Sequence, residues 1–185
     1  MTDDVIAEAK EKMQRAVEHA KAEFGSIRTG RASSALVERL RVDYYGSDVP
    51  LQQIAGFASP EPHLLVITPY DRGSLKAVEK AIQESDLGIT PSNDGSVVRL
   101  SFPSPTAERR KELVKTVKKK AEEGKVAVRN VRKHARQTVA AAEKSGDLPA
   151  GDVERLHKQI DQLTHEFEAE VDRLVTHKEQ ELLEV

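Results

Sequence analysis

Apolar residues recur every three or four positions in three long segments of the chain. This spacing places them on one side of an α-helix with 3.6 residues per turn. The segments are residues 3–28, Thr106–Lys144 and the stretch that follows Pro149. Thr106 suits a helix N-cap, Gly146 lies just past a helix end, and Pro149 suits a first helical turn. Three helices with one apolar side each predict a three-helix bundle.

Residues 30–105 follow a different pattern. Segments rich in β-branched and aromatic residues predict strands, and one short segment with helical spacing predicts a helix that Gly88 ends. Asn93, Asp94 and Gly95 tolerate the backbone of a tight turn between two strands. The predicted elements are strands at Arg39–Tyr45 and His63–Thr68, a helix at Ser74–Ser85, and two strands within Gly88–Phe102.

The order of these elements predicts an α+β protein with two domains. A discontinuous three-helix bundle comprises residues 1–29 and 106–185, and a small α/β domain comprises residues 30–105 between the first and second helices. Two neighbouring crossings then join the domains and form a hinge. Prolines in the second crossing cannot continue a helix, so the connection is short and partly stiff. The predicted hinge residues are Thr29, Gly30, Arg31, Pro103, Ser104, Pro105 and Thr106.

Composition limits where the protein works. The chain has 185 residues, 32% of them charged, and no cysteine, which fits a reducing compartment. No apolar run approaches the roughly 18 residues of a membrane span. The first residues are acidic and amphipathic, unlike a signal peptide. We therefore expect a cytoplasmic protein that does not interact with membranes.

Charge is distributed unevenly between the second and third helices. Residues 106–144 contain 13 Lys and Arg against 5 Asp and Glu, whereas residues 145–185 contain 4 against 11. On a helical wheel, five cations of the second helix fall on one narrow band beside its apolar stripe, and Lys133 lies off that band. The band consists of Lys118, Lys125, Arg129, Arg132 and Arg136.

This band has two interpretations. Charged helix faces are commonly solvated, and these cations can also pair with the acidic third helix. However, no Asp or Glu lies between Lys125 and Arg136, so pairing along the same helix is missing there. Arginine predominates, and its forked donors match phosphate oxygens. Since the basic helix has no aromatic residue on which bases could stack, we expect it to grip the backbone of structured RNA.

Two other classes of protein were weighed. An enzyme would need a recognisable site, and the sequence offers none. Gly73 lacks the spacing of a phosphate-binding P-loop, and the six histidines offer only the pair His157 and Asp161 on one helix face as metal ligands. No two carboxylates are placed for acid–base catalysis. We therefore expect no catalytic activity, no metal and no cofactor.

The third helix would also suit a coiled-coil interaction module without RNA binding. However, three helices with apolar stripes in one chain can pack against each other, which favours a monomeric bundle.

Motifs along essentially the whole chain resemble those of the ribosome recycling factor family of bacterial or organellar type. The motifs are SIRTGRAS (Ser26–Ser33), VDYYGSDVPLQQIA (Val42–Ala55), VEKAIQESDLGITPSNDGSVVRL (Val78–Leu100), PSPTAERRKEL (Pro103–Leu113) and VAVRNVRKHA (Val126–Ala135). The resemblance implies an L-shaped protein with a helical bundle and a small hinged domain. It also implies a factor that acts on the 70S-type ribosome after termination. Such a factor separates the subunits together with elongation factor G, and that partner hydrolyses GTP.

The resemblance also assigns residues. It maps ribosomal RNA contacts of the large subunit onto the basic helix, with Arg132 first and Arg129 next, and with Arg136, Lys125, Lys118 and Lys133 beside them. Arg28, Arg31 and Arg110 near the crossings are further candidates, and for Arg28 and Arg110 an ion pair that holds the helix ends is an equal alternative. Family members commonly carry arginine where this chain has Lys133, which keeps the charge but loses the bidentate fork.

Overall fold

The computed structural model describes residues 2–184, and they form two compact units. The first consists of residues 2–28 with Glu108–Leu183, and the second of Thr29–Ala107 with Glu184. The chain therefore enters the second unit at Thr29 and leaves it at Ala107, within two residues of the boundaries that the sequence pattern suggests. No helix in the described part of the chain is both long and apolar enough to cross a membrane.

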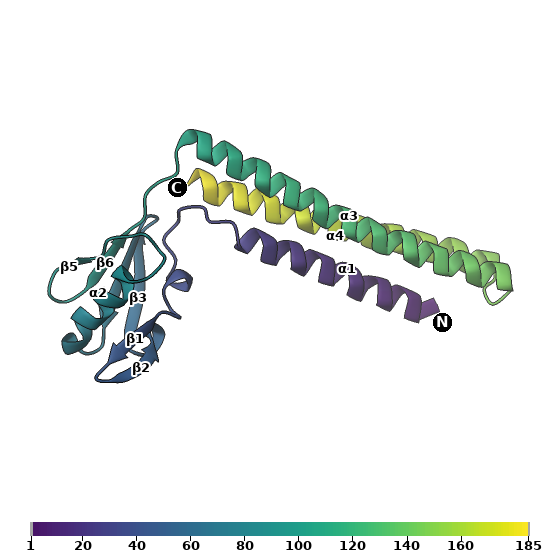
Figure 1. Cartoon of the computed structure of the whole chain (residues 1–185). Helices are drawn as coiled ribbons and strands as arrows, with labels where there is room; N and C mark the ends of the chain where they lie inside the picture. The colour runs from purple at the N-terminus through teal and green to yellow at the C-terminus, as the bar shows by residue number, and fades with distance from the viewer. Residues whose placement is uncertain (1, 185) are drawn as a thin grey trace. The chain divides into compact units, whose positions relative to one another are not determined.

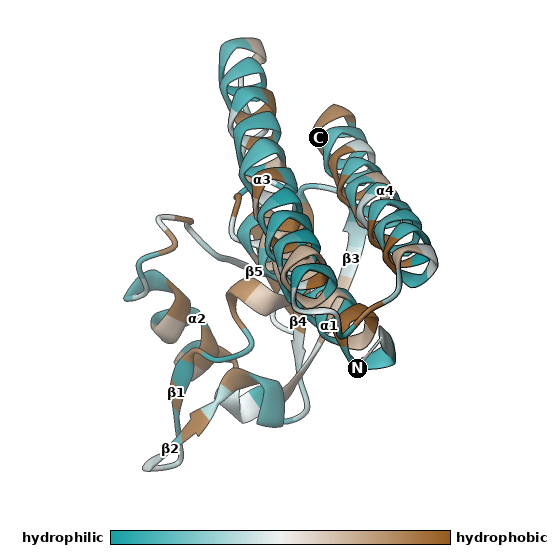
Figure 2. Ribbon diagram, turned by 90° about the vertical axis from the view of Figure 1, so that its right-hand side faces the viewer, coloured by the Kyte–Doolittle hydropathy of each residue, from teal (hydrophilic) through white to brown (hydrophobic). Residues whose placement is uncertain are grey.

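The first unit is a bundle of three helices (Figure 1). They are α1 (Thr2–Gly25), α3 (Ala107–Ser145) and α4 (Ala150–Leu183). Helices α1 and α4 run in the same direction, and α3 runs in the opposite direction. Apolar residues recur along all three helices (Figure 2), and Met13, Val117 and Val171 are fully buried where the three stripes meet. The bundle thus closes its own core, which favours it over an open coiled-coil surface.

The ends of the helices have local causes. Helix α1 stops at Gly25, earlier than the predicted residue 28, and the Ser26 hydroxyl donates to the carbonyl of Glu23 there. At the end of α3, Gly146 has a φ of +83°. Its amide donates to Glu143 at 3.0 Å, and the Asp147 amide donates to Ala142 at 2.9 Å. These two bonds form a Schellman motif, so the glycine ends α3 and turns the chain into α4.

The second unit contains an antiparallel sheet of four strands, a two-stranded hairpin and a short helix. The sheet order is β3-β4-β6-β5, and β1 pairs with β2. The predicted strands β1, β4, β5 and β6 and the helix α2 are confirmed. Helix α2 packs its apolar side, with Val78 and Ile82 buried, into the core of this unit. The bounds are β1 (Arg41–Tyr44), β2 (Ser47–Pro50), β3 (Ala55–Glu61), β4 (Leu64–Pro69), α2 (Leu75–Gln83), β5 (Ser92–Asn93) and β6 (Val98–Ser101).

Strands β2 and β3 are additional to the prediction. Strand β3 has the sequence AGFASPE, and its Gly, Ser and Pro residues weaken any strand signal. Pro60 is tolerated because β3 lies at the edge of the sheet, where a missing amide interrupts no inner ladder.

Helix α2 ends at Gln83, and Gly88, with a φ of +68°, lies in the loop that follows rather than at the helix end.

Both crossings of the chain bond to one turn of the second unit. The Ala32 amide donates to the Pro62 carbonyl at 2.7 Å, and the Phe102 amide donates to the His63 carbonyl at 2.7 Å. Ser104 Oγ lies 3.1 Å from His63 Nε2. The turn between β3 and β4 therefore anchors both connecting segments, whereas a movement about the crossings stays a prediction.

Candidate nucleic-acid interface

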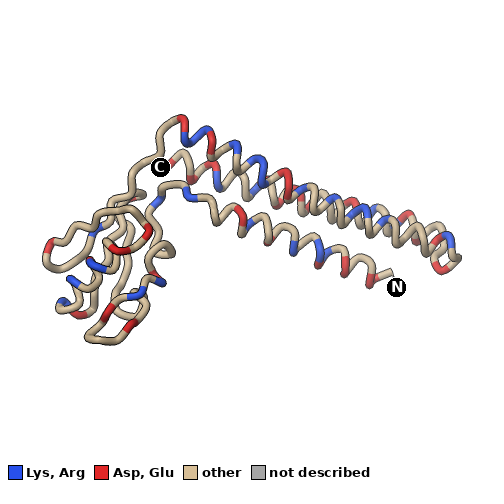
Figure 3. The backbone as a smooth tube through the Cα atoms, viewed as in Figure 1, with Lys and Arg blue, Asp and Glu red and all other residues tan. Residues whose placement is uncertain are grey.

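Four cations of α3 form a row along one side of the bundle. This cationic row consists of Lys125, Arg129, Arg132 and Arg136. It runs beside the buried stripe of the same helix, which includes Val128 and Val139. The row side chains are between 22% and 47% exposed, so their stems are partly covered while the charged ends reach the surface. Basic positions recur along α3 in Figure 3.

Every member of the cationic row has a carboxylate partner on α4. Lys125 Nζ lies 2.5 Å from Asp172 Oδ1, and Arg129 Nε lies 2.5 Å from Glu168 Oε1. Asp161 contacts two arginines at once. Its Oδ1 is 3.0 Å from Arg132 Nε, and both of its oxygens are 2.9 Å from Arg136 Nη1.

Arg129 has a second partner on its own helix. Its Nη1 lies 3.1 Å from Glu122 Oε1. The hydrogen bonds to Glu168 and then to Glu122 raise the pKa of Arg129 above its ordinary value. The guanidinium therefore stays charged at any physiological pH, and it is the permanence of this charge that suits a phosphate ligand.

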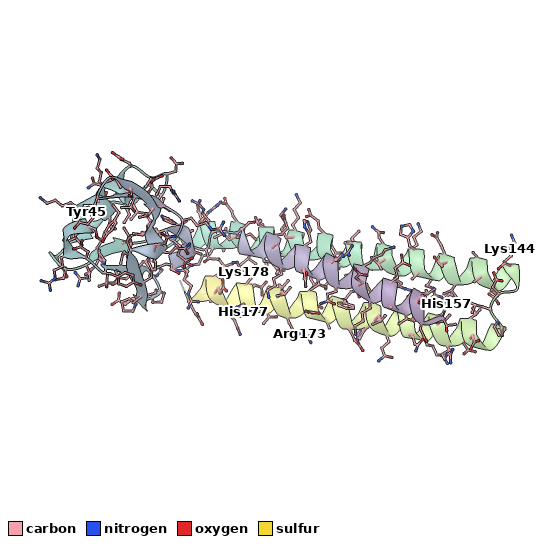
Figure 4. All side chains as sticks on the ribbon, turned by 90° about the horizontal axis from the view of Figure 1, so that it is seen from below. Tyr45, Lys144, His157, Arg173, His177 and Lys178 are labelled. Atoms are coloured by element: carbon pink, nitrogen blue, oxygen red, sulfur yellow. The ribbon has the colours of Figure 1, made fainter. Side chains whose placement is uncertain are left out.

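The three arginines of the row border an open depression of about 420 Å³. Six of its lining residues come from α3, and His157 comes from α4; His157 is labelled in Figure 4. No carboxylate belongs to the lining, although each of its three arginines has a carboxylate partner outside it. It is lined by Arg129, Arg132, Lys133, Arg136, Gln137, Ala140 and His157.

The remaining candidates lie outside the cationic row. Lys118 and Lys133 are exposed on α3, and Lys133 reaches the depression. Arg28 is exposed directly after the first helix, and Arg110 is half-buried in the first turns of α3. Arg31 Nη1 lies 3.2 Å from Glu184 Oε2. The structure thus brings Arg129, Arg132, Lys133 and Arg136 together around the depression, whereas Lys118, Arg28 and Arg110 of the same unit do not line it.

Sequence reasoning missed the residues that α4 contributes. The sequence indicates only an acidic third helix around Glu168 and Asp172, and it singles out Asp161 and His157 only as a possible pair of metal ligands. In the structure Asp161 forms ion pairs with both Arg132 and Arg136. Among residues 2–184, no group of three or more His, Cys, Asp or Glu residues lies close enough together to hold a metal ion.

The fold defines a class of two-unit α+β proteins in which a long three-helix bundle is interrupted by an inserted α/β unit. Residues 20–183 match the family model of the ribosome recycling factor. Curated ribosome-recycling factors from Acidothermus cellulolyticus and Salinispora tropica are 48% and 49% identical over all 185 residues, with full coverage of both chains. The chain therefore belongs to the ribosome recycling factor family.

Solved structures agree with this assignment. A solution structure of a ribosome recycling factor is 38% identical, with a TM-score of 0.74 and coverage of 100% of this chain and 98% of the other. A second structure contains the T. thermophilus ribosome recycling factor, with E. coli elongation factor G, bound to the E. coli post-termination complex. That factor is 42% identical, with a TM-score of 0.65 and 99% coverage of both chains.

Proposed function

We propose that this protein recycles the ribosome after termination of translation. It binds RNA of the large ribosomal subunit through the cationic row and, with elongation factor G, which hydrolyses GTP, promotes separation of the subunits and release of the mRNA. Membership of the family supports the general role, and a T. thermophilus relative bound with elongation factor G to a post-termination complex supports the partners. The protein itself acts as a monomer in the cytoplasm, without a catalytic site or a cofactor.

The cationic row carries the RNA-binding part of this proposal. It offers three guanidinium groups and one ammonium group at regular intervals along a single helix face, beside the depression that its arginines line. Phosphates of a folded RNA are recognised by such fixed, shape-matched donors. Arg129 and Arg132 both lie inside the row and line the depression, and the family resemblance puts Arg132 first, so binding should depend most on Arg132.

The arginines near the crossings are candidates for RNA contacts or for ion pairs that hold the helix ends. Arg28 is exposed and can reach RNA, whereas Arg31 has a carboxylate partner in Glu184. Arg110 is half-buried, which suits a bracing role at the start of α3 as well as a contact with RNA.

Binding to isolated large subunits tests the proposal directly. Arg132→Ala should weaken binding and make its salt dependence less steep, by up to about one in a log-log plot, because one phosphate contact is lost. Arg132→Lys distinguishes charge from geometry. A bidentate grip should leave the lysine variant weaker by about 1–3 kcal/mol, whereas a simple charge contact would be restored.

The matched control is Arg155→Ala. Arg155 is an exposed arginine of α4 that pairs with Asp152 and lies outside the cationic row. Its removal changes the net charge equally and should leave binding unaltered. Unchanged affinity and salt dependence for Arg132→Ala would show that the row is a solvated, ion-paired face and would overturn the RNA-binding proposal.

A further inference from the structure

The carboxylates that face the cationic row themselves form an ordered acidic row. Asp161, Glu168 and Asp172 are spaced by seven and four residues, which places them on one face of α4. Together with Glu122 of α3 they give four carboxylates for the four cations of the cationic row. The local charges are therefore balanced within the free protein.

These carboxylates use the same donors that an RNA phosphate would need. Carboxylate and phosphate oxygens both accept from the guanidinium fork, with similar distances. Arg132 already directs its Nε, and Arg136 its Nη1, at Asp161. A phosphate that takes these donors must displace a carboxylate or lie close beside it, and the two negative charges then repel.

The pairs are exposed enough to open. Asp161 is 47% and Asp172 is 61% exposed, so water can replace these carboxylates at small cost. Glu168 is 24% exposed, so its pair with Arg129 is more costly to open. Within residues 2–184, Lys118 and Lys133 have no ion-pair partner, and they leave some positive charge on α3 for a first encounter with RNA. RNA can then exchange for the carboxylates one pair at a time.

We propose that Asp161, Glu168 and Asp172 are an intramolecular competitor of RNA. They hold the cations of the row in ion pairs while the protein is free, and they lower its affinity for polyanions until phosphates placed to match the row take over the donors. The choice of RNA as ligand rests on the proposed function. The competition itself is a property of the paired helices and applies to any polyanion of suitable spacing.

The test compares Asp161→Asn/Glu168→Gln with the unaltered protein for binding to a short RNA duplex. Two amides keep the shape of the acids but remove the competing charges. Affinity should rise roughly threefold to tenfold, as expected for breaking exposed ion pairs, and the salt dependence should become steeper because more cations are free to neutralise phosphates. Asp172→Asn, which frees only Lys125, should give a rise of roughly twofold.

The matched control is Glu154→Gln/Glu166→Gln. Both residues lie on α4 and make contacts only within that helix, Glu154 with Lys158 and Glu166 with Gln162. This variant changes the net charge by the same amount. An equal rise in its affinity for the RNA duplex would mean that net charge alone explains the gain, and it would overturn the proposal. Unchanged or weaker binding of Asp161→Asn/Glu168→Gln, with its helical signal intact, would also overturn it.

Large subunits separate this inference from the proposed function. If Arg132→Ala binds large subunits normally, the proposed RNA contact fails, yet a gain of duplex binding by Asp161→Asn/Glu168→Gln would still support competition by the acidic row. If Arg132→Ala loses binding to large subunits while that duplex gain is absent, the proposed function holds and the inference fails.

Discussion

Gly124 lies on α3 where this helix packs closely against α1 and α4. A Cβ atom at this position would lie 3.0 Å from the Cβ of Ala20 on α1 and 3.9 Å from Val171 on α4. A glycine inside a helix costs about 1 kcal/mol relative to alanine. The close approach of the neighbouring helices offsets this cost, because a larger residue would force them apart.

Gly124→Val should therefore destabilise the protein by about 1–3 kcal/mol, the usual cost of overpacking a core. Urea denaturation followed by circular dichroism measures the change. Gly151→Val is the control, since no atom lies within 4 Å of the position where its Cβ would be. Since valine has a higher helix propensity than glycine, similar losses for both variants would mean that the contact with Ala20 is not the cause of the destabilisation.

Asp94 shows how the turn between β5 and β6 responds to acid. Its carboxylate accepts hydrogen bonds from the Val97 and Ser96 amides and from Arg99, and these bonds lower its pKa to about 2. In the unfolded chain the carboxyl group has its ordinary pKa of 3.8. Protonation therefore begins in the unfolded chain as the pH falls, and the contribution of Asp94 to stability is present above about pH 4 and disappears towards pH 2.

An NMR titration of the Asp94 carboxyl carbon should accordingly give a midpoint near pH 2. Because the backbone amides contribute more than Arg99, Arg99→Ala should raise this midpoint only in part and leave it below 3.8. A midpoint at the ordinary value in the unaltered protein would contradict the hydrogen bonds of the turn. In Asp94→Asn, the loss of stability between pH 4 and pH 2 should become smaller.

The cations of the row and a general pairing with the acidic third helix could be predicted from the sequence, whereas the individual carboxylate partners were not. Lys125 and Asp172, Arg129 and Glu168, and Arg136 and Asp161 each lie equally far from the Leu148–Pro149 bond. Two antiparallel helices joined by a short turn pair residues in this mirrored way. The residues that pair are therefore all visible in the sequence. However, it is the geometry of the turn, with Gly146 ending α3, that makes positions at equal distances from this bond face each other.

At the scale of elements, the turn from α3 to α4 fixes that register. Gly146 adopts a φ of +83°, which costs a residue with a Cβ atom about 1–2 kcal/mol. Gly146→Ala should destabilise the bundle by about 1 kcal/mol, as read from its thermal midpoint. Gly25→Ala, at the end of α1 and without a positive φ, is the control and should cause little change. Equal shifts for both would argue against the Schellman turn as the cause.

The elements also show which sequence signals are sufficient. The long helices were predictable because apolar residues such as Met13, Val117 and Ile160 repeat over many turns and all become buried. Strand β3 was not, since its Gly56 and Pro60 read as loop residues and only its pairing with β4 makes it a strand. Short strands depend on their neighbours in the sheet, and one sequence read locally does not contain those contacts.

At the scale of the whole molecule, the two units have separate cores, and the chain passes between them before Thr29 and after Ala107. The core around Ile67 and Val78 belongs to the second unit, and the core around Val117 belongs to the bundle. Each unit can therefore keep its own fold while the crossings change. The cationic row lies entirely on the bundle, so RNA binding and any work done by the second unit should be separable.

Lengthening the crossings tests this separation. Two glycines inserted after Gly30 and two after Ser104 should leave affinity for large subunits within about twofold, because the cationic row is untouched. The rate of subunit separation with elongation factor G and GTP should fall on the order of tenfold, since a loose connection transmits less of an imposed movement. The same four glycines inserted in the loop at Gly88 are the control and should leave both properties intact. Equal loss of binding and separation in a folded crossing variant would mean that the crossings support binding itself, and the hinge role of Thr29–Arg31 and Pro103–Thr106 would be wrong.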